Sequence, residues 1–328
     1  MEQEKMSSSI VENVKTSNRG YQLSCEVRNV PVSFMNAVRR VLLANIPTVV
    51  IRDVEILENT SQMPYEMLKH RVEMLPVNVS PNDVMTIRDA KIELRVGPEK
   101  TARTITTDDF VVESGREHIL MRDRDLDSPL LFLHLRPNES VHIRGRLAVE
   151  RMNVSQVCTA STSWKVDEDL AKTNKKKFVE EGGDPRTFDN FYVQRSFHRD
   201  EKGRPNWFEL SVESVGVLQA REILKMALPI LRQNIDEFIN EALENIQRDQ
   251  DSFSVTVERS GHWKHSLGYM FQEAMYSDQN VGFVGYDIPH PLRDTMVIRF
   301  TTKKTPESVL KTARDTIEEY CSVLEKAV

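Results

Sequence analysis

Residues 34–48 read FMNAVRRVLLANIPT, and this stretch decides how the N-terminal part of the chain folds. Its apolar residues recur at the three- and four-residue spacing of a helix that buries one face. These residues are Phe34, Ala37, Val38, Val41 and Leu42. Ser33 is a candidate N-cap, and Pro47 ends the helical pattern before a strand expected over residues 48–56. The stretch therefore predicts a short amphipathic helix followed by a strand.

Alternating or apolar runs predict further strands on both sides of this helix. The candidates are residues 21–27, 84–87, 90–96, 130–135, 141–149 and 207–213. A long helical pattern begins at Gln219, with apolar residues close to a heptad seam. They are Leu224, Leu228, Leu231, Ile235, Phe238, Ala242 and Ile246. We expect Pro229 to kink this helix, because its ring meets the carbonyl of Lys225.

A second unit begins after Asp249 and predicts the element order β-α-β-β-α. Its strands are expected at residues 253–257, 281–288 and 296–301. The stripe of its first helix consists of Leu267, Met270, Phe271, Ala274 and Met275. The stripe of its last helix, which begins at Pro306, consists of Leu310, Ala313, Ile317, Tyr320, Cys321 and Leu324.

These elements predict an α+β fold with two related modules. We expect a disordered tail at 1–18, a discontinuous first module at 19–51 and 200–248, and a second module at 249–328. Residues 52–199 form an inserted strand-rich domain, with a mobile loop at 165–189 where charges are mixed and apolar residues few. Each module has an apolar helical face that it cannot bury alone, so the two are expected to pair within the chain. The residues predicted to make this contact are Phe34, Val38, Leu42, Leu224, Leu231, Ile235, Phe238, Leu267, Phe271, Leu310, Ile317 and Leu324.

Composition narrows the class of protein. Of 328 residues, 39% are hydrophobic and 29% charged, as in an ordinary globular protein, and the net charge of −6 does not favour nucleic acid as a direct ligand. The three cysteines lie far apart in the sequence and read as reduced thiols. Residues 1–9 lack an apolar signal-peptide core, and no apolar run reaches the ~20 residues of a membrane helix. We therefore expect a soluble intracellular protein.

Several motifs together resemble a known family. Residues 34–43 with 46–48 resemble the signature of the α-like RNA polymerase subunits: the bacterial α N-terminal domain, the archaeal D protein and the third-largest eukaryotic subunit. KHRVEMLPV at 69–77, residues 150–164 and FELSVESVG at 208–216 are similar to further elements of that family, in its order. HSLG at 265–268 and FVGYDIPHPL at 283–292 resemble the small partner of these proteins, archaeal L or the eukaryotic eleventh subunit. The two modules are thus identified as RNA polymerase dimerisation modules.

The resemblance implies a non-catalytic scaffold subunit of a DNA-dependent RNA polymerase, on which the two large catalytic subunits assemble with small accessory subunits. It implies nucleic-acid contact only through the complex, no membrane, and no obligate homodimer. Both partner types in one chain resemble a fusion found in polymerases of large DNA viruses. The expected location is then the host cytoplasm (viral factory) or the virion, and otherwise the nucleus. The implied contacts with the large subunits are Asn36, Arg39, Arg40, His70 and Arg71.

No catalytic residue, metal or cofactor is expected. Many D-like proteins of this family carry a cysteine cluster in the inserted domain, whereas no cysteine lies between Cys25 and Cys158 here. Three aspartates at 123, 125 and 127 could imitate the carboxylate cluster of a metal nuclease, but the neighbouring Arg122 and Arg124 are expected to neutralise their charge. His262, His265 and His290 could suggest zinc, which needs three or four convergent ligands, but no nearby cysteine or second His-x-x-His pair completes such a set. We therefore interpret them as ordinary turn and loop histidines.

Two further alternatives remain open from the residues alone. Arg39-Arg40 and His70-Arg71 suit an interface with carboxylates, but paired cations of this kind are also common on a solvated surface. The alternative function is a nucleic-acid-binding transcription factor. It requires a basic stripe with base-reading or stacking residues, which the acidic balance disfavours.

Overall fold

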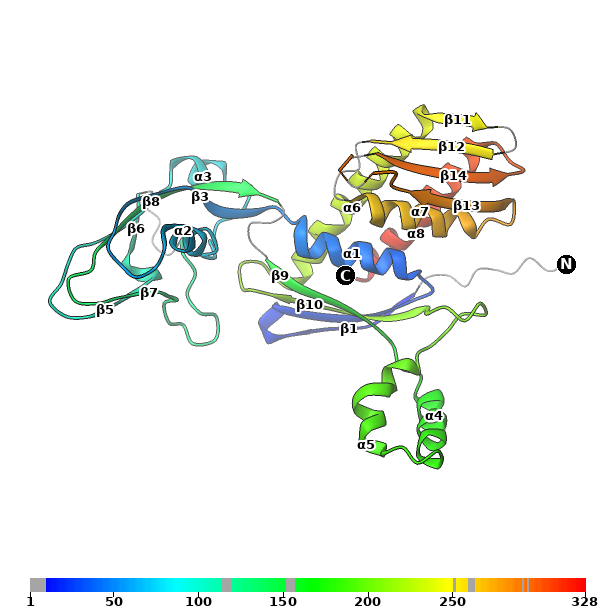
Figure 1. Ribbon diagram of the computed structural model, residues 1–328, viewed down its shortest axis with the longest axis horizontal. Coiled ribbons are helices and arrows are strands. Elements are labelled where there is room, and N and C mark those ends of the chain that lie inside the picture. Colours follow the sequence, from blue (N-terminus) through cyan, green and yellow to red (C-terminus); the bar gives the residue numbers. More distant parts are fainter. Residues whose placement is uncertain are drawn as a thin grey trace. The chain divides into compact units, whose positions relative to one another are not determined.

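The computed structural model describes residues 10–113, 119–151, 157–249, 252–258, 263–290, 292–293 and 295–328. The chain divides into two compact units (Figure 1). Unit 1 comprises the chain up to Leu42, Ala160–Glu213 and Ala220–Val328, and unit 2 comprises Leu43–Thr159 and Ser214–Gln219. The predicted α+β class is confirmed. Unit 2 begins at Leu43 rather than at residue 52, and residues 160–199, which were expected to belong to the insert, lie in unit 1.

The first sheet of unit 1 has the strand order β1-β2-β10-β9. Its strands are β1 (Ile10–Ser17), β2 (Gln22–Arg28), β9 (Cys158–Trp164) and β10 (Trp207–Ser214), with a 3₁₀ turn, η1 (Asn18–Gly20), between β1 and β2. β2 pairs antiparallel with β10, so that Cys25 lies opposite Leu210 and Val27 opposite Phe208. These four side chains are buried, which confirms the alternation seen at 21–27 and 207–213.

The prediction of a disordered tail over residues 1–18 is wrong for residues 10–17, which form β1. β1 pairs antiparallel with β2, with Ile10 opposite Arg28 and Ser17 opposite Gln22, and it contacts the C-terminal helix of the same unit. Its side chains are exposed or half-buried, so the strand carries little of the apolar alternation on which the prediction depended. Backbone hydrogen bonds to β2 stabilise it. Residues 1–9 lie outside the described residues.

The second sheet of unit 1 has the order β11-β12-β14-β13. Its strands are β11 (Ile246–Asp249), β12 (Ser252–Val257), β13 (Val281–Asp287) and β14 (Met296–Thr302). From β12 onward the elements follow the expected order β-α-β-β-α. Ile246 was predicted to continue the seam of the long helix. It instead begins β11, opposite Val255, because the helix ends at Glu244 and only Asn245 lies between them.

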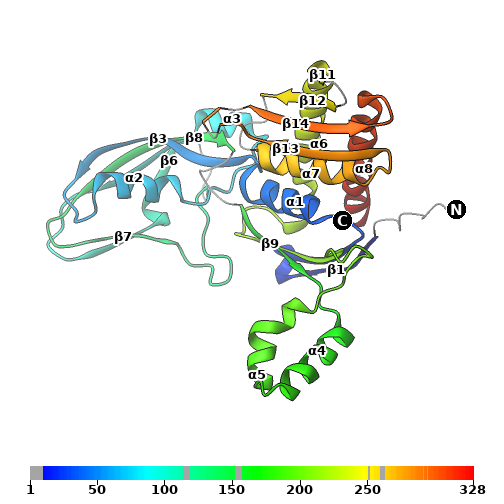
Figure 2. The ribbon, with the colours of Figure 1, turned by 45° about the vertical axis from the view of Figure 1, so that its right-hand side comes forward.

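Four helices lie between the two sheets of unit 1 (Figures 1 and 2). They are α1 (Val32–Ala44), α6 (Ala220–Glu244), α7 (Lys264–Tyr276) and α8 (Pro306–Ala327). Each buries most of the apolar stripe that its sequence spacing predicts, although Ala274 of α7 and Tyr320 of α8 are half-buried. Pro229 lies inside α6. Ser33 is not the N-cap of α1, because the helix begins at Val32 and the Ser33 hydroxyl donates to Glu273.

The prediction of a mobile loop over residues 165–189 is wrong, because these residues form helices. They contain α4 (Glu168–Glu180) and α5 (Pro185–Thr187), followed by a π-helical turn, η3 (Phe188–Tyr192), and a 3₁₀ turn, η4 (Val193–Arg195). The side chain of Asp167 accepts hydrogen bonds from the backbone of Asp169 and Leu170, which caps α4. We call this element, residues 167–196, the helical hairpin.

Unit 2 contains a four-stranded sheet of order β3-β8-β4-β6 and a smaller sheet of β5 and β7. The strands are β3 (Thr48–Asn59), β4 (Lys91–Val96), β5 (Arg103–Thr106), β6 (Phe110–Glu113), β7 (Leu131–Leu135) and β8 (Val141–Glu150). The helices are α2 (Tyr65–Glu73), α3 (Val84–Asp89) and the 3₁₀ turn η2 (Thr107–Asp109). Residues 84–87 were predicted to be a strand and form α3 instead, because the Asp83 side chain caps a helix at Thr86.

Among the described residues, no helix is both long enough and apolar enough to cross a membrane.

Candidate protein–protein interface

Aromatic side chains connect the helices of unit 1 that precede Asn245, α1 and α6, to the helices that follow it, α7 and α8. The ring of Phe34 on α1 lies 5.4 Å from the ring of Tyr320 on α8, and the ring of Phe238 on α6 lies 4.4 Å from the ring of Phe271 on α7. α8 packs against both α6 and α7. Helices on both sides of Asn245 therefore share one core.

The structure places every residue predicted for intramolecular pairing in this core. All of them are at most 2% exposed: Phe34, Val38, Leu42, Leu224, Leu231, Ile235, Phe238, Leu267, Phe271, Leu310, Ile317 and Leu324. Burial of such side chains stabilises the fold by about 1.5–3 kcal/mol each. Their specific role in pairing the two modules stays a prediction.

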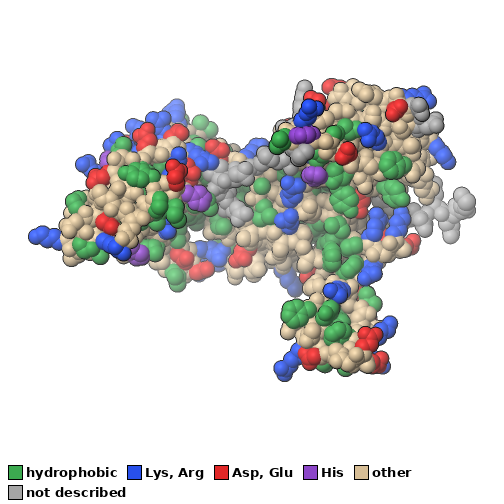
Figure 3. All heavy atoms as spheres, viewed as in Figure 1, with side chains coloured by type: hydrophobic (Ala, Val, Ile, Leu, Met, Phe, Trp, Pro, Cys, Tyr) green, Lys and Arg blue, Asp and Glu red, His purple; other side chains and the backbone are tan. Residues whose placement is uncertain are grey.

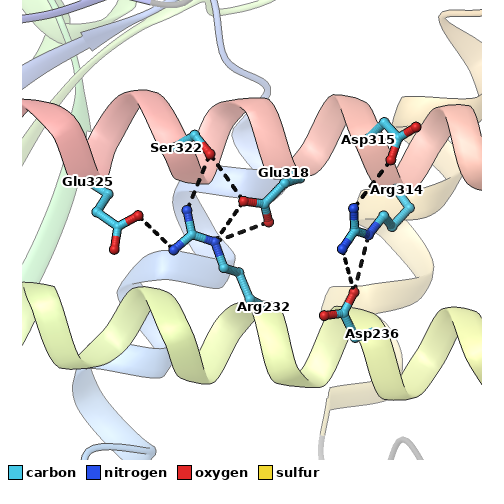
Figure 4. Close-up of polar contacts among 7 residues, drawn as sticks. All are labelled: Arg232, Asp236, Arg314, Asp315, Glu318, Ser322 and Glu325. Atoms are coloured by element: carbon cyan, nitrogen blue, oxygen red, sulfur yellow. Dashed lines mark hydrogen bonds and ion pairs between the residues drawn. The ribbon is translucent and has the colours of Figure 1, made fainter.

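Two sets of charged groups cross between α6 and α8 (Figure 4). The Arg232 guanidinium on α6 donates to Glu318 on α8 at 2.8 Å and lies 2.8 Å from the Glu325 carboxylate. Arg314 on α8 donates to Asp236 on α6 at 2.9 Å. Burial lowers the pKa of Arg232, but the carboxylates of Glu325 and Glu318 more than offset this and hold it above its ordinary value.

The order of these charges matches antiparallel helices. Moving along α6 from Arg232 to Asp236 corresponds to moving backwards along α8 from Glu318 to Arg314. With α8 reversed, Arg232 would face Arg314 and Asp236 would face Glu318, which are like-charged pairs. The charge pattern thus favours the observed orientation and register, in the way that paired charges select partners in coiled coils.

Glu273 of α7 is a second polar connection. Its carboxylate accepts a hydrogen bond from the Ser33 hydroxyl of α1 at 2.6 Å and lies 3.5 Å from the Arg204 guanidinium. The hydrogen bond from Ser33 fixes the N-terminal end of α1 to α7. Glu273 also affects α8: burial, together with the charge of Glu273, raises the pKa of Tyr320 to about 12, so the phenol stays neutral.

The predicted contacts for the large subunits divide into two groups. On α1, Arg39 donates to the Asn36 side chain at 2.8 Å, and Asn36 is exposed. Arg40 donates to Ser266 of α7, and its guanidinium lies 5.2 Å from the centre of the Trp263 ring. Arg40 therefore has partners within unit 1, whereas Arg39 has a local partner at the surface.

The second group lies on α2 in unit 2. His70 and Arg71 are exposed there, as an interface requires. The sequence reasoning missed their neighbours: Tyr65, Met67 and Met74 are 54%, 59% and 46% exposed. Positions 67, 70, 71 and 74 share one helical face, and Tyr, Met and Arg are enriched in interfaces. This helical spacing can be seen in the sequence, but Met and Tyr residues that recur at helical spacing more often indicate a buried core face than an interface. We call these five residues the α2 surface.

The other candidate groups have structural partners. Asp123 accepts hydrogen bonds from the backbone of Asp125 and Leu126, and Asp125 pairs with Arg124. His290 accepts from the backbone of Leu292, and the ring of His265 lies near Tyr286. His262 lies outside the described residues. Within the described ranges, no three His, Cys, Asp or Glu side chains form a group that could hold a metal ion.

The cysteines are buried in separate places. Burial raises the pKa of Cys25 to about 11, with a contribution from the charge of Glu26, and raises that of Cys158 and Cys321 to about 12. None of the three forms a disulfide. Thiols with such raised pKa values are poor nucleophiles near neutral pH.

Comparison with known proteins agrees with this arrangement. Two family models, both described as the RNA polymerase Rpb3/Rpb11 dimerisation domain, match residues 24–235 and residues 261–327. The chain is 26% identical to the DNA-directed RNA polymerases I and III subunit rpac1 of Dictyostelium discoideum, over 68% of this chain and 80% of the relative. It is 26% identical to the DNA-directed RNA polymerase subunit Rpo3 of Pyrococcus furiosus, over 66% of this chain and 90% of the relative.

A third relative is the DNA-directed RNA polymerase II subunit RPB3 of Schizosaccharomyces pombe, 26% identical over 73% of this chain and 89% of the relative. The first family match covers more than half of the chain, from β2 into α6, and the second runs through α7, β13, β14 and α8. The chain therefore belongs to the RNA polymerase Rpb3/Rpb11 dimerisation-domain family.

Proposed function

We propose that this chain is a non-catalytic assembly subunit of a DNA-directed RNA polymerase, in which both members of a dimerisation pair occur in one polypeptide. The observation that carries this proposal is the packing of α8, in the second matched segment, against α6, which begins in the first. Relatives named as RNA polymerase subunits align over most of their own length. In this proposal the chain has a structural role in the enzyme, and the partner subunits carry the catalytic residues.

In this proposal unit 1 is a rigid platform on which the two large catalytic subunits assemble. Two separate surfaces contact them: Asn36 and Arg39 on α1, with Arg40 behind them, and the α2 surface on unit 2. Arginine and aromatic anchors dominate interface energies, and an exposed apolar stripe beside cations fits an acidic partner surface. Small accessory subunits complete the assembly, nucleic acid is contacted only through the complex, and the chain is not an obligate homodimer.

The finer proposal is that this polymerase belongs to a large DNA virus. It rests on the fusion of the two partner types, which the sequence motifs at 34–48 and 283–292 support. The chain would then act in the host cytoplasm or be packaged in the virion. Its presence in purified particles tests this, and an exclusively nuclear location contradicts it.

Affinity purification of the tagged chain from its native source tests the main proposal. We expect one copy of the chain with two large partners, no separate small dimerisation partner, and template-dependent RNA synthesis by the complex only. RNA synthesis by the chain alone contradicts the non-catalytic assignment. Isolation of the chain without large partners, together with a salt-dependent shift of naked DNA, supports the transcription factor instead.

A further inference from the structure

The helical hairpin carries a groove between its two arms. The first arm is α4, and the second arm comprises α5, η3 and η4. Phe178 from the first arm and Phe188 and Tyr192 from the second form the floor of the groove, and the volume of the groove is about 340 Å³. Lys177, Glu181 and Arg195 line its rim. Ligand pockets start at roughly 300 Å³, so this groove has room for one large side chain rather than for a nucleotide cofactor.

The two arms are held in a fixed position. The Lys175 ammonium lies 2.6 Å from the Asp189 carboxylate, and the Asn174 amide donates to the Ser196 hydroxyl at 2.9 Å. The Phe178 ring packs directly on the backbone at Gly183, where a Cβ atom would lie only 2.2 Å from the ring. The groove is therefore formed before any ligand binds, which lowers the entropy cost of binding.

Two exposed apolar side chains are the sequence neighbours of residues that line the groove. Phe191, on the second arm, is 74% exposed, and Val179 of α4 is 41% exposed. Figure 3 shows hydrophobic side chains at the surface of the helical hairpin, the part drawn below the first sheet. Exposed phenylalanine beside an aromatic-floored groove is the arrangement of a protein-binding site rather than of a solvated helix pair.

The rim is more positive than negative. Lys172, Lys175 and Lys176 each pair with an acidic side chain of the helical hairpin. By contrast, the Lys177 ammonium has no hydrogen-bond or ion-pair partner within the described part of the chain, and the Arg195 guanidinium lies 4.6 Å from the centre of the Tyr192 ring. Two such cations beside one carboxylate favour a ligand with net negative charge.

We propose that the helical hairpin docks an acidic segment of another polymerase subunit, which places one large apolar side chain in the groove that Phe178, Phe188 and Tyr192 line. The identity of the partner rests on the proposed function. The cations Lys177 and Arg195 pair with carboxylates that flank the inserted side chain, and Phe191 covers it from the side.

The test uses the full chain in the assembled polymerase, with a photo-crosslinking phenylalanine analogue at position 191. We expect a crosslink to one segment of a polymerase subunit that has net negative charge and a large apolar residue. That segment, synthesised as a fluorescent peptide, should bind the full chain and lose at least tenfold in affinity with the double variant K177E/R195E. The matched control K172E/K176E makes the same charge change on α4 outside the groove and should bind as the wild type does.

Three results overturn the proposal: no protein crosslink from position 191, a crosslink to nucleic acid or to a segment without net negative charge, or equal loss of affinity in both double variants. The K177E/R195E variant should still co-purify with the two large subunits. A chain that assembles normally but gives no crosslink contradicts the hairpin proposal alone, whereas a chain that never enters a polymerase contradicts the proposed function as well.

Discussion

The ring of Phe238 on α6 lies 4.4 Å from the ring of Phe271 on α7, at an interplanar angle of 36°. Both side chains are buried, and they belong to helices on opposite sides of Asn245. An offset aromatic pair of this kind contributes about 0.5–1.5 kcal/mol beyond the area that it buries. The pair is therefore one of the contacts through which the helices before and after Asn245 stabilise each other.

Replacing Phe238 with alanine should lower the free energy of unfolding by about 3–5 kcal/mol, because it leaves a cavity opposite Phe271. Phe238→Leu should lose less, since it fills part of that space. Phe191→Ala is the control, and at an exposed position it should stay within about 0.5 kcal/mol of the wild type. Chemical denaturation of the full chain measures all three, and equal stability of the alanine variants contradicts the shared core.

Reversing the charge of Arg232 tests the polar contact between α6 and α8. Arg232→Glu places a carboxylate beside Glu318 and Glu325, so we expect a lower melting temperature. The second change Glu318→Arg should restore part of it, with a coupling energy of roughly 1 kcal/mol. Because these side chains are partly exposed, the coupling should shrink in 1 M salt. The control pair is Lys176 and Glu180, which is largely exposed and should show almost no coupling.

Arg39 and Arg40 should behave differently. Arg40→Ala removes the hydrogen bond to Ser266 and the contact with Trp263, and should cost about 1–2 kcal/mol of folding stability. Arg39→Ala should change stability by less than about 0.5 kcal/mol, yet weaken assembly with the large subunits if it anchors them. Val38→Asp, in the buried stripe, should prevent folding. Thermal melts and a pull-down of the large subunits distinguish these cases. An Arg39→Ala variant that still assembles fully indicates a solvated surface.

Acid should destabilise unit 1 through Glu26. Burial favours a raised pKa for Glu26, but hydrogen bonds from Lys165 and Trp207 prevail and hold it below the ordinary value of 4.5. A lowered folded-state pKa stabilises the fold above pH 4.5, and this contribution is lost as the pH falls through the folded-state pKa. Glu26→Gln should cost about 1–2 kcal/mol at pH 7, with the difference from wild type disappearing in acid.

The control for Glu26 is Glu209→Gln, which removes the other carboxylate bound to Lys165. Glu209 is 47% exposed at its side chain, so its loss should change both stability and pH dependence less. Unfolding free energies between pH 7 and pH 3 compare the two variants. Parallel pH profiles for wild type and Glu26→Gln contradict the assignment.

Much of the fold could be predicted from periodicity, because most of its elements bury one face. The stripes of α1, α6, α7 and α8 and the alternation in β2 and β10 each report a buried side. β1 and α4 could not be found in this way: α4 has no buried residue, and β1 depends on backbone pairing with β2 rather than on a buried face. Local charge and low apolar content in α4 resemble a disordered segment, although capping by Asp167 and the Phe178–Phe188 contact order the helical hairpin.

The interface residues were harder to predict for a related reason. A buried stripe identifies core residues such as Phe34 and Phe271, but the pattern does not predict which other helices these residues pack against. Exposed apolar residues such as Met67 and Met74 have the same spacing as core residues, so only their exposure reveals them. Arg40 lies outside the apolar stripe, yet its contact with Ser266 depends on the position of α7, which no local pattern contains.

A single residue, Asn245, separates α6 from β11, and β11 is already part of the second sheet. Where two such modules are separate gene products, their numbers must be balanced and each can be left without its mate. In the fusion that we propose, translation delivers them in equal amounts, and dilution does not dissociate them. On that proposal the cell has no orphan half to degrade, and the first step of assembly does not depend on concentration.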